Sequence, residues 1–299
     1  MRILFISATR IGDAVLSTGL LDTLLHRHPA ARFTIACGPV AAGIFTRMPQ
    51  LERILTVRKR RLDAHWLTLW GQTATTVWDL AVDLRGSALT FLLPVCRRAI
   101  MRGGRRPGHR LTHLAGTLGL SPPPLPVAWT DASDREMAAR LLPAGAPIIG
   151  LGPTANWSGK IWPPDRFVAL FGALQSGPFP GGRPAVFAGP GDGERALAAT
   201  VLAALPGAID LAGRLTLPQA SACLARTSLF VGNDSGLMHM AAAAGAPTLG
   251  LFGPTPASEY APTGRRASAA LAEGPPGAAP MNALSVSAAL QAALRLIEA

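Results

Sequence analysis

The sequence predicts an α/β protein built from two parallel-sheet units in series. Three observations support this: apolar runs alternate with segments of helical apolar spacing, the alternation restarts after a proline-rich stretch, and 49% of the residues are hydrophobic. The 299 residues suit about two domains of ordinary size. Only 15% of the residues are charged, which favours a large core and excludes a disordered chain.

The first unit opens with an apolar run at residues 2–7 that predicts a strand. Residues 14–26 follow with apolar side chains at helical spacing, and further strands are predicted at 32–37 and 80–84. A strand, a helix and a second strand in this order are typical of a parallel sheet.

The second unit begins after proline-rich segments at 121–126 and 142–147. Residues 254–282 are rich in Pro, Gly and Ala and are expected to form loop. We expect strands at 148–151, 185–188, 229–232 and 248–252, and helices at 165–174, 194–205, 237–244 and 286–298.

Positive charge is concentrated in the first half of the chain. The formal net charge is +11; residues 1–145 hold 19 Lys or Arg against 9 Asp or Glu, whereas residues 146–299 hold 9 against 8. This asymmetry indicates an anionic partner for the first half: nucleic acid, an anionic membrane or a phosphorylated substrate. Residues 97–110 contain six Arg and no aromatic residue, which argues against nucleic acid.

Several familiar motifs are absent from the sequence. The three cysteines form neither a disulfide framework nor a zinc motif, so we expect a reducing compartment. The first apolar run is too short for a signal peptide, and no apolar window is long enough to span a membrane. HExxH, CxxC, GxSxG and Asp-x-Asp are all missing, which favours chemistry without a metal.

The first candidate segment, residues 10–16, follows the first predicted strand, where open α/β sheets bind ligands. Gly12 permits a ligand to approach the backbone, and Asp13 places a carboxylate in the loop. Asp13 also suits a helix N-cap, so a structural role stands beside a catalytic one.

The second candidate segment, residues 152–165, lies between a predicted strand and a predicted helix. Six residues separate its two glycines and Ile161 follows the lysine, so the segment is not a Walker loop, which needs four residues and a Ser or Thr. Lys160 can reach a phosphate as a point charge, or lie exposed on the surface. Trp162, before two prolines, predicts a hydrophobic staple rather than a base-stacking platform.

The third candidate segment, residues 231–247, joins a strand to an Ala-rich helix. The N–H groups near Ser235 and Gly236 would form an anion site that the helix dipole strengthens. Asp234 is either a helix cap or a site residue, and His239 is either structural or catalytic.

The fourth candidate segment, residues 189–194, is a glycine cluster between a strand and a helix. It forms either a plain turn or a ligand loop. Glu194, in the first helical turn, can cap the helix or accept ribose hydroxyl groups.

Taken in order, these segments resemble the heptosyltransferase family of lipopolysaccharide biosynthesis. Asp-Ser-Gly-x-x-His before the Ala-rich helix is the most specific piece, and the set spans nearly the whole chain. The matching pieces are residues 10–13, 159–163, 189–192, 233–239, 245–247 and 251–255.

The resemblance implies a GT-B-like fold, with two Rossmann-like parallel-sheet domains facing across a cleft. The acceptor domain would span residues 1–145, the nucleotide-sugar domain residues 146–285, and a last helix at 286–299 would pack back on the first domain. The implied enzyme is an inverting, metal-independent glycosyltransferase without a cofactor. It would move a heptose or related sugar from a nucleotide diphosphate donor, ADP-heptose, to a lipopolysaccharide-core acceptor at the cytoplasmic face of the inner membrane.

On this resemblance Asp13 is the general base, and Lys160 with the turn Asp234–Gly236 holds the diphosphate. Arg102, Arg105 and Arg106 would bind the lipid-linked anionic acceptor and an anionic membrane, or form only a solvated face. The other donor-site residues would be Gly12, Thr154, Glu194, Ser235 and His239. Two alternatives stay open: a catalytically inactive nucleotide-binding relative and a basic nucleic-acid-binding protein.

Overall fold

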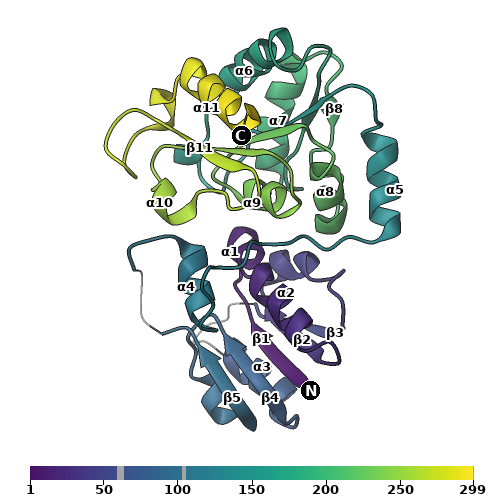
Figure 1. Cartoon of the computed structure of the whole chain (residues 1–299), viewed down its shortest axis with the longest axis vertical. Coiled ribbons are helices and arrows are strands. Elements are labelled where there is room, and N and C mark those ends of the chain that lie inside the picture. The colour runs from purple at the N-terminus through teal and green to yellow at the C-terminus, as the bar shows by residue number, and fades with distance from the viewer. Residues whose placement is uncertain (59–63, 103–105, 299) are drawn as a thin grey trace. The chain divides into compact units, whose positions relative to one another are not determined.

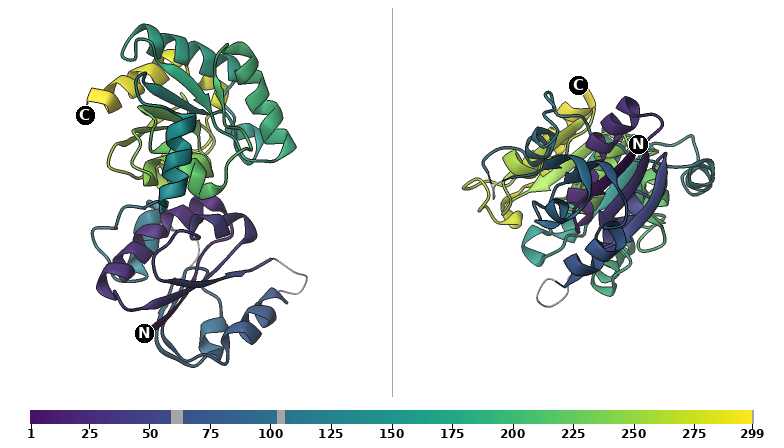
Figure 2. Two further views of the ribbon diagram at one scale, coloured as in Figure 1. Left: turned by 90° about the vertical axis from the view of Figure 1, so that its right-hand side faces the viewer. Right: turned by 90° about the horizontal axis from the view of Figure 1, so that it is seen from below.

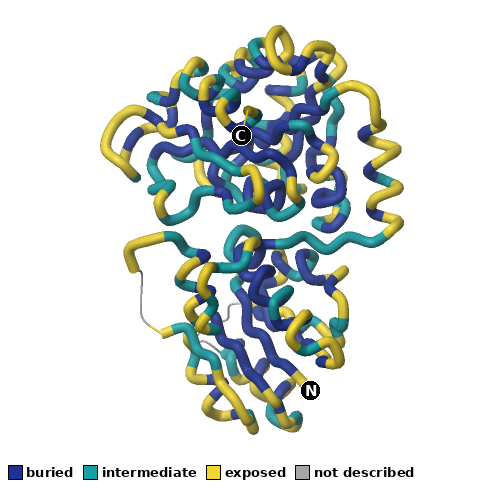
Figure 3. The backbone as a smooth tube through the Cα atoms, viewed as in Figure 1, coloured by how far each residue is buried: buried dark blue, intermediate teal, exposed yellow. Residues whose placement is uncertain are grey.

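The computed structural model of the chain describes residues 1–58, 64–102 and 106–298. They form two compact units, Met1–Trp129 and Thr130–Ala299, each built around one parallel sheet (Figure 1). The helices of each unit cover both faces of its sheet (Figure 2). Buried residues follow the central strands of each sheet, and exposed residues lie on the outer helices, the loops and the two edge strands of the first sheet (Figure 3).

The first unit has a five-stranded sheet in the order β3-β2-β1-β4-β5, and every neighbouring pair is parallel. Its strands are β1 (Arg2–Ile6), β2 (Arg32–Cys37), β3 (Leu51–Thr56), β4 (Trp78–Asp83) and β5 (Val95–Ile100). Its helices are α1 (Ile11–Leu16), α2 (Thr18–Arg27), α3 (His65–Thr73) and α4 (Arg110–Gly116), with 3₁₀ turns η1 (Pro39–Ile44) and η3 (Leu89–Leu92).

The single helix expected at residues 14–26 is split at Ser17. Ser17 Oγ donates to Ala14 O at 2.7 Å and lies 3.0 Å from Ser7 Oγ. A serine hydroxyl that bonds the preceding turn competes with the helical hydrogen bonds. Helix α1 therefore ends at Leu16, and α2 begins at Thr18.

The backbone of residues 124–127, after α4, packs directly on the first turn of α2. Val127 N donates to Thr18 Oγ1 at 2.8 Å. A Cβ atom on Gly19 would lie 2.5 Å from Leu125 O and 2.7 Å from Pro124 O. Only glycine leaves room for this crossing.

The second unit has a six-stranded sheet in the order β11-β10-β9-β6-β7-β8, again with parallel neighbours. Its strands are β6 (Ile148–Gly152), β7 (Arg183–Val186), β8 (Ile209–Asp210), β9 (Leu229–Asn233), β10 (Thr248–Phe252) and β11 (Ala267–Leu271). Its helices are α5 (Ala132–Leu141), α6 (Pro164–Ser176), α7 (Asp192–Ala204), α8 (Leu217–Leu224), α9 (Gly236–Ala243), α10 (Ala257–Tyr260) and α11 (Val286–Glu298), with 3₁₀ turns η4 (Ser158–Lys160) and η5 (Met281–Ala283).

The domain limits differ from those expected at residues 145 and 285. The second unit begins at Thr130 because α5 packs against α8, and Arg226 Nε donates to Leu142 O at 2.7 Å. Helix α11 packs against α6, β10 and β11 of the second unit, whereas the sequence placed it back on the first domain. Its small buried residues, Ala289 and Ala293 among them, let it approach that core closely.

The segment 254–282 is not loop throughout, because it contains α10 and β11. Strand β11 pairs with β10 from Thr248↔Ala267 to Phe252↔Leu271. Its sequence, Ala-Ser-Ala-Ala-Leu, lacks the β-branched and aromatic residues that signal a strand. Within the described part of the chain, no helix has the length and apolarity needed to cross a membrane.

We expect Gly19→Ala to lower the free energy of unfolding by about 1–3 kcal/mol, because the added Cβ meets carbonyl oxygens that cannot rotate away. Gly71→Ala is the matched control in the same unit, since nothing lies within 4 Å of its Cβ position in α3. That change should be neutral or stabilising by about 0.5–1 kcal/mol. Urea unfolding measures both, and equal stability of the two variants would contradict the close crossing.

Candidate functional site

The strand order reverses at the centre of each sheet. In the second sheet the chain runs from β6 outward to β8, then returns to β9 on the other side of β6 and continues to β11. The first sheet reverses in the same way between β1 and β4. Loops that leave neighbouring strands at such a reversal diverge, and open α/β sheets bind ligands in the crevice between them.

Lys160 and Asp234 lie in the two loops that leave the reversal of the second sheet. Lys160 Nζ donates to Asp234 Oδ2 at 2.5 Å, although the residues are 74 positions apart. The side chains are only 17% and 8% exposed, so each ion compensates a charge that is largely removed from solvent. Lys160 is therefore not an exposed surface lysine.

Trp162 and Asn233 connect the same two loops. Trp162 N donates to Asn233 Oδ1 at 3.1 Å, and the buried indole donates to Leu284 O at 2.8 Å. The indole packs edge-to-face on Phe167 with ring centroids 5.1 Å apart. Trp162 precedes the N-cap of α6 and Phe167 lies in its first turns, which confirms the predicted hydrophobic staple.

Glu194 joins the loop after β7 to the loop after β6. Its Oε2 accepts hydrogen bonds from Gly189 N at 2.8 Å and from the buried Thr154 Oγ1 at 3.0 Å. The N-cap of α7 is Gly191, so the Glu194 carboxylate bridges two loops rather than capping the helix. Thr154 and Glu194, both predicted donor-site residues, are thus brought together.

Helix α9 begins directly after Asp234, with Ser235 as its N-cap and Gly236 as its first residue. Ser235 Oγ is buried without a hydrogen-bond partner among the described residues, and so is Thr255 Oγ1 in the loop after β10. The first-turn N–H groups of a helix have no intrahelical partner and favour anions. His239 is buried one turn further along the helix.

Asp13 lies in the first turn of α1, after the end of β1. It does not cap the helix, because the N-cap is Arg10 and no side chain makes a cap hydrogen bond there. Asp13 Oδ1 lies 3.7 Å from Arg110 Nε at the start of α4, and the two side chains are 28% and 25% exposed. Gly12 precedes this carboxylate in the same turn.

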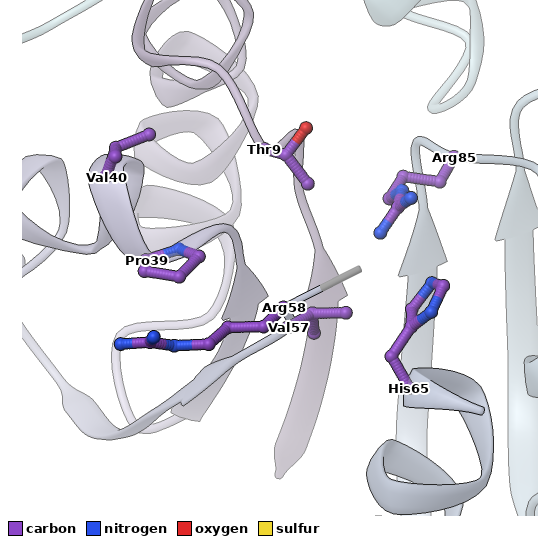
Figure 4. A pocket seen from close by; sticks show the side chains of 7 residues that line it. All are labelled: Thr9, Pro39, Val40, Val57, Arg58, His65 and Arg85. Carbon is purple, nitrogen blue, oxygen red and sulfur yellow. The ribbon is translucent and has the colours of Figure 1, made fainter. Parts of the chain in front are cut away.

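A pocket of about 530 Å³ opens where strands of the first sheet end (Figure 4). Arg85 and His65 lie on one side of it, and Pro39 and Arg58 on the other (Figure 4). Arg85 follows β4, where its N–H donates to the buried carboxylate of Asp83 at 2.8 Å. The lining residues are Thr9, Pro39, Val40, Val57, Arg58, His65 and Arg85.

The arginines between residues 97 and 110 do not share one role. Arg98 donates to the carbonyl oxygens of Thr90, Leu93 and Val95, and so stabilises the turn before β5. Arg110 pairs with Asp13.

The three predicted acceptor residues follow β5. Arg106 Nη2 donates to Arg102 O at 2.7 Å, and Arg105 lies outside the described residues. The positive net charge of the chain comes entirely from the first unit. Residues 1–129 hold 17 Lys or Arg against 6 Asp or Glu, whereas residues 130–299 hold 11 of each.

The sequence pattern singles out neither His65 nor Arg85, and it marks Arg58 only as part of a basic cluster at residues 58–61. Strand β3, which precedes Arg58, and helix α3, which starts at His65, were not predicted. Arg85 follows a predicted strand, so its place at a strand end was the one available signal. Thr255 belonged to a quoted motif but had no assigned role.

The two units carry different chemistry. The second unit brings together a lysine, a helix N-terminus and the Ser235 hydroxyl, which has no partner among the described residues, and such a set can bind a diphosphate. The first unit offers a carboxylate that can accept a proton and a pocket with two guanidinium groups that can bind an anion. Residues 1–58, 64–102 and 106–298 contain no cluster of three or more His, Cys, Asp or Glu that could hold a metal ion.

Comparisons with known proteins agree with the family resemblance seen in the sequence. The family model for glycosyltransferase family 9 (heptosyltransferase) matches residues 106–280, more than half of the chain. Lipopolysaccharide heptosyltransferase 2 of Salmonella typhimurium is 26% identical, over 85% of this chain and 83% of the relative.

Solved structures share the fold at lower identity. Heptosyltransferase II of E. coli superimposes with a TM-score of 0.77 at 21% identity, covering 100% of this chain and 99% of that one. An E. coli heptosyltransferase with ADP-2-deoxy-2-fluoro heptose gives 0.71 at 20% identity, covering 97% and 98%. The fold class predicted from the sequence, a GT-B-like pair of parallel-sheet domains, is thereby confirmed.

We expect Lys160 and Asp234 to be strongly coupled in stability. In a double-mutant cycle of Lys160→Ala and Asp234→Ala, urea unfolding should give a coupling energy of about 1–3 kcal/mol, because each single change leaves a shielded ion without its counter-ion. The exposed pair Arg214–Asp210 in the same unit is the control and should couple by less than about 1 kcal/mol. Additive single changes at Lys160 and Asp234 would contradict the pairing.

Proposed function

We propose that this chain, which belongs to glycosyltransferase family 9, the heptosyltransferases, transfers a heptose or related sugar from ADP-heptose to a lipopolysaccharide-core acceptor. The observation that carries the proposal is the family match over residues 106–280, which includes Lys160, Glu194 and Asp234. The relatives named lipopolysaccharide heptosyltransferases support the acceptor, and the neighbour with ADP-2-deoxy-2-fluoro heptose supports the donor.

Lys160 and the start of α9 would hold the donor diphosphate. Breaking the bond to the sugar leaves extra negative charge on this group, and a lysine with oriented N–H groups stabilises it. Ser235 Oγ, which is buried and has no hydrogen-bond partner among the described residues, is available as a further donor, and Gly236 allows the phosphate to approach the backbone. His239 and Thr154 would complete the surroundings. These groups would neutralise the leaving group without a metal ion.

Glu194 would accept the ribose hydroxyl groups of the nucleotide. Its Oε2 already receives two hydrogen bonds from Gly189 and Thr154, which fix the carboxylate in place. The other oxygen, Oε1, would then face the ribose with its position set beforehand.

Asp13 would take the proton from the acceptor hydroxyl as that oxygen attacks the anomeric carbon. The attack displaces the diphosphate from the opposite face and inverts the configuration. Arg110, 3.7 Å from the carboxylate, would keep Asp13 oriented. Arg102, Arg105 and Arg106 would bind the anionic acceptor and the membrane that anchors it, at the cytoplasmic face of the inner membrane.

The direct test is transfer itself, followed by mass spectrometry with purified lipopolysaccharide core as acceptor. ADP-heptose should support transfer, UDP-sugars should not, and a chelator should leave the rate unchanged. No transfer from any nucleotide sugar, together with a thermal shift on ADP binding, would instead identify an inactive relative.

We expect Asp13→Asn to lower kcat by about 10²–10⁴-fold, because the amide cannot accept the proton. Donor binding, measured by calorimetry with ADP, should change little. Asp22→Asn, another carboxylate of the first unit, is the control and should keep full activity. Full turnover by Asp13→Asn would remove Asp13 from the chemistry.

Lys160→Ala should weaken ADP binding and lower kcat, since loss of one such donor costs about 2.7–4 kcal/mol in transition-state stabilisation. Lys160→Arg should restore little of the ADP binding and kcat, because the largely buried site beside Asp234 suits a compact ammonium group. Arg214→Ala, an exposed cation of the same unit, is the control. Donor KM and kcat that match wild type in Lys160→Ala would overturn this assignment.

A further inference from the structure

We propose that an apolar patch on the first unit, formed by α3 and η3, inserts into an anionic membrane surface. The inference rests on the proposed function, because a lipid-anchored acceptor must be reached at a membrane. The patch consists of four exposed side chains: Leu67 (73%) and Trp70 (43%) on α3, and Phe91 (63%) and Leu92 (69%) on η3.

The two elements form one continuous layer. Helix α3 contacts η3, and Trp70 Nε1 donates to Leu92 O at 3.1 Å. Their inner side chains, Leu69 and Leu89 among them, are buried in the core against the sheet. The patch residues are the outward side chains of the same layer, so no packing within the described part of the unit covers them.

Exposed cations border this layer and contact it. Arg53 Nη2 donates to Gln72 O at the end of α3. Arg98 donates to Thr90 O within η3. The guanidinium of Arg85 lies 4.7 Å from the Trp66 ring centroid. Residues 64–78 and 84–130 contain no Asp or Glu at all.

Charge complementarity decides which partner fits. An apolar patch bordered by arginines matches a surface that offers acyl chains and anionic headgroups together. A second copy of the chain would bring two strongly cationic units into contact, so self-association through this patch is opposed by charge. Tryptophan at the patch suits the membrane interface, where one face is apolar and the other is wet.

Helix α3 links the patch to the pocket, because its first residue lines the pocket and its later residues carry part of the patch. His65 lines the pocket and begins α3, and Arg85 both lines the pocket and contacts Trp66. Insertion of the patch would hold the arginines that contact α3 and η3, namely Arg53, Arg85 and Arg98, at the headgroups. A saccharide that extends from a lipid anchor would meet those cations directly.

The test uses the full chain and vesicles of phosphatidylglycerol with phosphatidylethanolamine, in co-sedimentation at low and high salt. The triple variant Leu67→Ser, Phe91→Ser, Leu92→Ser should bind at least tenfold more weakly than wild type and keep the wild-type melting temperature. The matched control replaces Leu271 and Leu141, exposed leucines of the second unit, by Ser and should bind normally. High salt should weaken wild-type binding.

Activity separates this inference from the proposed function. The triple variant should transfer normally to a delipidated acceptor and slowly to the same acceptor in vesicles. Absence of transfer to both acceptors by wild type would refute the proposed function while leaving the vesicle result intact. Three outcomes would contradict the assignment of the patch to the membrane. These are failure of the wild-type protein to bind these vesicles, binding of the triple variant as tight as that of wild type, and loss of binding only when Arg102→Gln and Arg106→Gln are combined. A wild-type dimer that the triple variant dissociates, without vesicle binding, would assign the patch to self-association instead.

Discussion

The reversal of strand order at the centre of each sheet is the constraint on which the candidate sites depend. Parallel strands send every outgoing loop to the same edge of the sheet, and the loops diverge only where the order reverses. In the first unit Asp13 and Arg85 lie in the segments that follow β1 and β4, and in the second unit Lys160 and Asp234 lie in the segments that follow β6 and β9. The strand order therefore determines where the candidate residues of both units lie.

The Lys160–Asp234 ion pair explains how a lysine can stay charged in a largely buried site before an anionic ligand binds. A lysine largely removed from water needs a counter-charge, and Asp234 supplies it at 2.5 Å. A bound diphosphate would offer Lys160 a second anionic partner close to the start of α9. The buried hydroxyl of Ser235 has no partner within the part of the chain that the structure describes, and such a hydroxyl gains most from a ligand that accepts its hydrogen bond.

The sequence predicted the elements whose signals are local. Residues 32–37, 248–252 and 286–298 have the bounds of β2, β10 and α11, because long apolar or periodic runs determine them. The pairing of Lys160 with Asp234 joins loops that meet only through the strand order, so no local pattern reveals it. The arginines of residues 97–110 look equivalent in sequence, yet the carbonyl oxygens that Arg98 binds exist only once η3 is folded.

The targets proposed for the two units, a compact diphosphate and an extended membrane, would account for their uneven charge. A diphosphate is compact, so one lysine and one helix terminus can neutralise it while the second unit as a whole holds equal numbers of positive and negative residues. A membrane is extended, and its attraction acts on every cation within about 10 Å of the surface at ordinary ionic strength. Only a unit with a general excess of arginine gains from such a target. The first unit, with 17 Lys or Arg against 6 Asp or Glu and an apolar patch bordered by Arg53, Arg85 and Arg98, has that composition.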